Sequence, residues 1–101
     1  MDQLEFKKLE SFFVDALQKN GISVSQLIIG SVINFNVEQS NSGHDLILVS
    51  DQFNNVSADE RNQLTAAAEI RTQRTMGIPF RCLKLSPDEY QVYIIMQSGI
   101  F

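Results

Sequence analysis

Hydrophobic and polar positions follow two periods along this chain, one helical and one of strand type. Over residues 3–19 apolar side chains recur at helical spacing with charged residues between them. This pattern is typical of an amphipathic helix that packs one face on a core. The residues that fall largely on one face are Leu4, Leu9, Phe12, Phe13, Ala16 and Leu17. Gly21 comes soon after them and is expected to end the helix.

Shorter apolar stretches indicate strands. Residues 24–29 are short, largely apolar and β-branched at their end, which is typical of a strand. Residues 78–85 predict a further strand, with Pro79 restricted to its beginning. Residues 45–50 contain a continuous apolar run, Leu46–Val49, behind one charge, and this suits a central strand covered on both faces. Residues 32–37 predict a half-buried strand or an extended connection, and residues 38–43 are polar and predict a turn or loop.

Two start signals predict further helices. Ser57 with Glu60 three residues later forms a capping box, and the helix that it opens is expected to stop at Gly77. The stretch Ser86–Glu89 is a second start signal, with proline at the first helical position. Residues 90–96 suit either a helix or a strand.

The order of these elements predicts a compact α/β or α+β fold, with a small mixed β-sheet and flanking helices. A chain of 101 residues with 44% hydrophobic residues can close one core, so we expect a single domain over residues 1–101.

Composition and charge narrow the function classes. The net charge of −4 argues against non-specific binding to nucleic acid, and no apolar run is long enough to cross a membrane. The acidic start has no secretory signal and the single cysteine cannot form an internal disulfide, so the expected location is the reducing cytoplasm.

All charged residues are acidic within residues 38–60 and basic within residues 71–84. These are either two solvated surfaces or a basic face for a phosphate or an acidic partner.

Several stretches in order resemble one family. These are residues 27–31, residues 45–53, residues 77–80 and residues 85–90. Together they resemble the minimal nucleotidyltransferases, small proteins with the catalytic fold of DNA polymerase β that are often encoded as antitoxins beside a helical partner. The resemblance covers roughly residues 24–97.

The resemblance implies a particular metal chemistry. In this family a Gly-Ser turn offers backbone N–H groups and a hydroxyl to a triphosphate. Two aspartates at alternate positions of the next strand, with a third acid on a neighbouring strand, hold two Mg²⁺ ions. The ions orient the attacking oxygen and neutralise the leaving pyrophosphate. One carboxylate cannot hold that pair of cations.

Carried over to this sequence, the family pattern is incomplete. The turn is present as Gly30 and Ser31, and Asp45 matches the second aspartate. The first aspartate falls on Gly43 and the third acid on Arg81, whose charge would repel Mg²⁺. The resemblance thus implies a vestigial metal position at Asp45, with no catalytic residues and no bound metal. It leaves Gly30, Ser31 and Arg81 as candidate phosphate-binding residues, against a simple tight turn at Gly30 and a turn-capping role for Asp45.

Other residues offer weak substitutes for the missing ligands. The path of the loop that holds Glu38 is not fixed, and Asp51 should lie past the far end of the strand. His44 should point opposite to its neighbour on the strand. Cys82 lies in an apolar strand and is expected to be buried and inert.

Three arginines could form a further cluster. Arg71 and Arg74 lie about one helical turn apart, and the fold could bring them near Arg81 to form an anion site.

The sequence therefore favours a catalytically degenerate nucleotidyltransferase-fold protein that binds another protein, as an antitoxin, inhibitor or regulator, without a cofactor. Its partner could contact the acidic segment of residues 38–51 or the apolar residues 90–101, which could also form a homodimer or simply pack in the core. The alternative is an active Mg²⁺-dependent enzyme that transfers a nucleoside monophosphate. A third hypothesis is nucleotide binding without turnover, through Gly30, Ser31 and Arg81.

Overall fold

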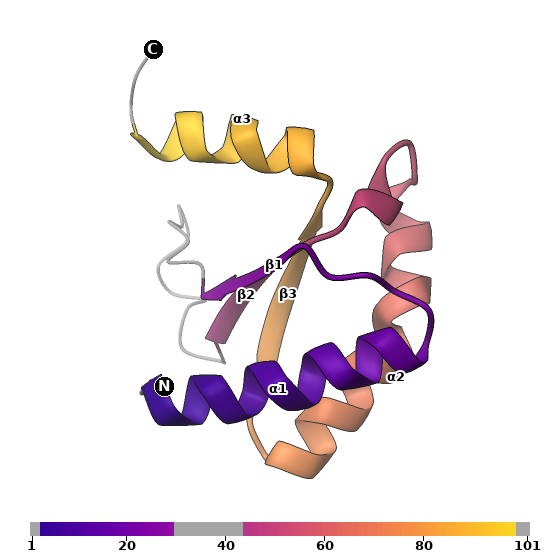
Figure 1. Cartoon of the computed structure of the whole chain (residues 1–101), viewed down its shortest axis with the longest axis vertical. Coiled ribbons are helices and arrows are strands. Elements are labelled where there is room, and N and C mark those ends of the chain that lie inside the picture. Colours follow the sequence, from indigo (N-terminus) through magenta and orange to yellow (C-terminus); the bar gives the residue numbers. More distant parts are fainter. Residues whose placement is uncertain (1–2, 30–43, 99–101) are drawn as a thin grey trace.

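The computed structural model describes residues 3–29 and 44–98, which form α-helices, β-strands and one short 3-10 helix (Figure 1). In chain order these are α1 (Gln3–Lys19), β1 (Gln26–Ile29), β2 (His44–Val49), η2 (Asp51–Phe53), α2 (Ala58–Met76), β3 (Phe80–Leu85) and α3 (Pro87–Ser98). The predicted small mixed sheet with flanking helices is confirmed. The elements expected at residues 32–37 and 38–43 lie outside the described residues.

β2 is the central strand of the sheet. The strand order is β1-β2-β3, with β1 antiparallel to β2 and β3 parallel to it. Residues Leu46, Ile47, Leu48 and Val49 are all at most 2% exposed. Because successive side chains of a strand point to opposite faces, both faces of β2 are covered. The prediction of a central strand buried on both sides is therefore confirmed.

One face of the sheet packs against α1 and α2. The buried core joins residues of both helices to alternate strand residues. Its members are Leu9, Phe13, Ala16, Leu17, Ile22, Leu27, Leu46, Leu48, Phe53, Ala68 and Phe80. The rings of Phe13 and Phe80 lie 5.2 Å apart between centroids, so α1 packs directly on β3. Burying a side chain such as that of Phe13 contributes about 1.5–3 kcal/mol.

Both long helices begin and end close to where the sequence predicts. α1 ends at Lys19, and Gly21 then takes a φ of +82° while the N–H of Ile22 donates to the carbonyl of Leu17 at 2.9 Å. α2 begins after Ser57, whose hydroxyl accepts a hydrogen bond from the N–H of Glu60. It ends at Gly77, where φ is +69°.

Residues 90–96, which the sequence leaves open between helix and strand, are helical and belong to α3. The start signal decides the outcome. The N–H of Glu89 donates to the hydroxyl of Ser86 at 3.3 Å, and the Glu89 carboxylate accepts from the N–H of Ser86 at 2.8 Å. This reciprocal pair is a complete capping box, with Pro87 in the first helical position where it needs no N–H partner.

α3 lies at the opposite end of the molecule from α1, as Figure 1 shows. It follows directly on β3 and takes no part in the core beneath α1 and α2. None of the helices within residues 3–29 and 44–98 combines the length and the apolar character needed to cross a lipid bilayer.

Candidate functional site

Asp45 and Arg81 are direct neighbours in the sheet. Asp45 is the second residue of β2, and in the parallel ladder its partner on β3 is Arg81. The resemblance places the third metal-binding acid at this position of β3. A guanidinium, which stays charged at every pH that a protein tolerates, therefore occupies the ladder position beside Asp45. Gly30 and Ser31 lie outside the described residues.

The described side chains form no cluster of metal-ligating residues. Among the side chains that the structure describes, in residues 3–28 and 46–96, no three His, Cys, Asp or Glu residues are grouped closely enough to hold a metal ion together. Asp51, considered above as a substitute ligand, is exposed and begins η2 beyond the C-terminal end of β2. Glu38 lies outside the described residues.

The structure does not gather Arg71, Arg74 and Arg81 into one anion site. Phe80 belongs to the core under α1 and α2, and Cys82 packs against it. Arg81 lies between them on β3 and so points to the opposite face of the sheet from α2. The guanidinium of Arg71 lies 6.0 Å from the centre of the Phe12 ring on α1, which is a cation–π arrangement.

Arg61 on α2 binds three different parts of the chain. Its Nε donates to the carbonyl of Val56 at 2.9 Å, and its Nη2 donates to the carbonyl of Phe53 at 2.8 Å. Its Nη1 donates to the carbonyl of Lys84 at 2.9 Å. The guanidinium also forms an ion pair with Glu89 at 2.5 Å, and the Arg61 side chain is only 11% exposed. The residue thus joins the segment after β2, the end of β3 and the first turn of α3.

The contacts with Arg61 change the pKa of the Glu89 carboxylate. Its hydrogen bonds with the Arg61 guanidinium lower the pKa of Glu89, and the hydrogen bond from the backbone N–H of Ser86 lowers the pKa further. Both contacts favour the ionised form. The charge that anchors α3 is therefore present over the neutral range.

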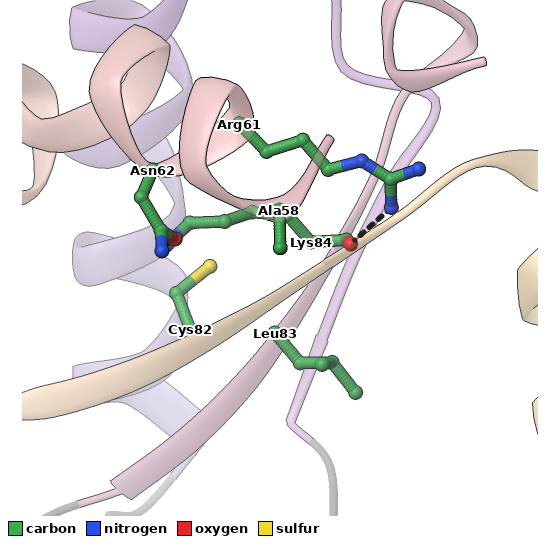
Figure 2. A pocket seen from close by; sticks show the side chains of 6 residues that line it. All are labelled: Ala58, Arg61, Asn62, Cys82, Leu83 and Lys84. Carbon is green, nitrogen blue, oxygen red and sulfur yellow. Dashed lines mark hydrogen bonds between the residues drawn. The ribbon is translucent and has the colours of Figure 1, made fainter. Parts of the chain in front are cut away.

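A pocket of about 230 Å³ lies between the start of α2 and β3 (Figure 2). Its lining residues are Ala58, Arg61, Asn62, Cys82, Leu83 and Lys84. Pockets that enclose drug-sized ligands usually measure about 300–1,000 Å³, so this one suits at most a small molecule. Figure 2 shows the Cys82 sulfur directed toward α2, whereas Leu83 points away from it.

The polar groups of this pocket are bound to one another. The ammonium of Lys84 lies 2.8 Å from the Glu69 carboxylate and 2.9 Å from the Asn62 carbonyl oxygen. Glu69 also accepts a hydrogen bond from the hydroxyl of Thr65 at 2.6 Å. Burial raises the pKa of the Cys82 thiol to about 12, so the thiol stays protonated and unreactive near neutral pH. The sequence predicts a buried, inert cysteine, whereas Cys82 is only partly buried at the margin of the core and lines the pocket. The pocket therefore holds no thiol activated by a lowered pKa.

α3 and the adjoining strand β3 carry exposed apolar side chains. Large apolar side chains that are 42–56% exposed gather on these two elements. They are Leu83, Val92, Ile94, Ile95 and Met96. The α3 members belong to the apolar segment that the sequence offers as a partner contact or as core. Their exposure shows that they are not core residues of the isolated chain, and such clusters are typical of interaction surfaces.

Sequence reasoning missed Arg61. The residue stands one position after Glu60 of the capping box, and no local pattern distinguishes it from other helix arginines. Its partners are carbonyls and a carboxylate that only the fold brings together.

Searches of protein-family models, curated proteins and solved structures found no match to this chain.

Proposed function

We propose that this chain is a catalytically degenerate protein of nucleotidyltransferase fold that acts by binding another protein, as an antitoxin, an inhibitor or a regulator does. The observation that carries the proposal is the exposed apolar surface of α3, formed by Val92, Ile94, Ile95 and Met96. An aliphatic surface of this kind costs free energy in water and is stabilised when a partner covers it.

The neighbourhood of Asp45 supports binding over catalysis. Two Mg²⁺ ions need several carboxylate ligands, and the residue beside Asp45 in the ladder is the cation Arg81. A metal ion and a guanidinium are both positively charged, so they repel each other at neighbouring positions, and this opposes metal binding there. The pocket between α2 and β3 supplies no substitute, because its Lys84 and Glu69 charges are paired with each other.

Titration with ATP and other nucleoside triphosphates, with and without Mg²⁺, tests the proposal. Calorimetry should detect no saturable binding under either condition, and no pyrophosphate should be released. The matched variants are Asp45→Asn and Arg81→Ala, which should behave like the unmodified chain.

Two other results would each replace the proposal with a different function. Mg²⁺-dependent binding with pyrophosphate release, lost in Asp45→Asn, would show an active nucleotidyltransferase. Binding that needs no metal and is lost in Arg81→Ala would show a nucleotide-binding protein without turnover.

A further inference from the structure

We infer that the partner of the α3 surface is a second copy of this chain, with the two α3 helices packed against each other across a two-fold axis. The inference rests on the proposed function, since it names the partner in a protein that acts by protein binding.

The exposed residues of α3 include a stripe suited to helix pairing. Val92, Ile95 and Met96 are three and four positions apart, so they lie on one side of the helix within about one turn. Their exposed fractions are 55%, 52% and 56%. Ile94 lies on another side of the helix and is 42% exposed. A helix that is apolar on more than one side is normally buried by its neighbours.

The charge pattern favours a second copy over a dissimilar partner. Residues 90–98 contain no charged side chain, which corresponds to about 13 Å of uncharged helix. In a two-fold interface each surface meets itself, so any charge near the axis faces its own copy and repels it. The stripe has no such charge. It also has no charged groups through which a partner of opposite charge could be selected.

α2 restricts a second route to self-association, strand pairing along β3. β3 is an edge strand, and unpaired edges are common sites of strand-to-strand association. Gln73 donates from Nε2 to the carbonyl of Phe80, and Arg61 donates to the carbonyl of Lys84. These two outward carbonyls at the ends of β3 are thus already bonded. These bonds restrict pairing along β3 only, and β1 is the other edge strand of the sheet, so the inference rests on the α3 stripe itself.

α3 is held firmly enough to present the stripe in a fixed direction. Arg61 pairs with Glu89 in its first turn, and Ser86 and Glu89 close the capping box. The rings of Tyr90 and Tyr93 stack with centroids 6.3 Å apart on another side of the helix. A preorganised helix loses little conformational entropy on pairing, which favours association.

Sedimentation over a concentration series tests the inference. The unmodified chain should change from its 11.4 kDa monomer to a species of twice that mass in the micromolar range. Val92→Glu and Met96→Glu, prepared separately, should each weaken the dimer about tenfold or more, because a buried charge would face its own copy across the axis. Circular dichroism spectra should match the unmodified chain.

The matched control is Ile70→Glu on α2. Ile70 is 51% exposed, so the substitution introduces the same charge at a similarly exposed apolar position away from α3. Dimerisation of this variant should be unchanged. A chain that stays monomeric at millimolar concentration, or a dimer that persists in both α3 variants, would overturn the inference. A monomer that binds a different protein through the same stripe would also overturn it. The nucleotide titration is independent of these outcomes, so a failure of the proposed function remains distinguishable.

Discussion

Arg61 stabilises this fold through contacts that no other described side chain provides. Four hydrogen-bond acceptors surround one guanidinium, at the carbonyls of Phe53, Val56 and Lys84 and at the Glu89 carboxylate. The guanidinium also lies 5.6 Å from the centre of the Phe53 ring. Only the planar, five-donor geometry of arginine can serve acceptors in so many directions.

Arg61→Lys is expected to lower the free energy of unfolding by about 2–4 kcal/mol, because an ammonium cannot reach all these acceptors and leaves buried carbonyls unpaired. Urea denaturation followed by circular dichroism measures the change. The control is Arg74→Lys at an exposed position of the same helix, which should change the free energy by at most about 0.5 kcal/mol. Equal effects of the two substitutions would contradict the role assigned to Arg61.

The pH dependence of stability should carry the signature of Glu89. Arg61 and the Ser86 backbone lower the pKa of Glu89 in the folded chain below its value in the unfolded chain. The resulting stabilisation is therefore fully present above the unfolded-state pKa and is lost as the pH falls through the lower folded-state pKa.

Glu89→Gln removes this titration. The difference in urea midpoint between the unmodified chain and Glu89→Gln should be largest at neutral pH and should shrink as the solution is acidified through the glutamate range. A difference that stays constant or grows in acid would show that the ion pair with Arg61 does not act as described.

Most helices and strands could be predicted because their signals are local. The capping box at Ser57 and the terminal Gly77 bound α2, and the apolar run of residues 45–50 matches β2. α3 could not be assigned from its interior, because β-branched residues at 92, 94 and 95 suit a strand equally well. Its start signal was the stronger local information, and the structure follows it.

Gly77 ends α2 in a left-handed conformation, and substitution of this residue tests whether the helix needs that end. With φ at +69°, an alanine at Gly77 should lower the free energy of unfolding by about 1 kcal/mol through backbone strain alone, since no atom lies within 4 Å of the added Cβ. Thr75→Ala, at an exposed position in the last turn, should cost nothing or stabilise slightly. A neutral Gly77→Ala would mean that the helix does not need this end.

At the scale of the whole molecule, the main buried core lies on one face of the sheet, beneath α1 and α2. α1 and α2 seal one face of the sheet, whereas α3 carries exposed aliphatic side chains at the other end of the molecule (Figure 1). The basic residues within positions 71–84 do not form an anion site in the fold. Strand alternation puts Arg81 on the face opposite Phe80 and Cys82, but only the fold shows that α2 packs on the Phe80 face, so the sequence could not reject the arginine cluster.

The candidate site was less predictable than the fold. The ladder partner of Asp45 depends on a parallel pairing between strands more than thirty residues apart, and one shift in register would replace Arg81 by a neighbour. The exposure of α3 likewise depends on the tertiary arrangement, because the same apolar pattern could have been buried.

Uptake of Mn²⁺, measured by electron paramagnetic resonance with a non-hydrolysable ATP analogue present, tests the central claim most directly. Free Mn²⁺ is compared in the same nucleotide solution with and without protein. Because a guanidinium stands beside Asp45 in the ladder, the protein should take up no additional Mn²⁺. Two additional ions bound per chain, and lost in Asp45→Asn, would contradict the account.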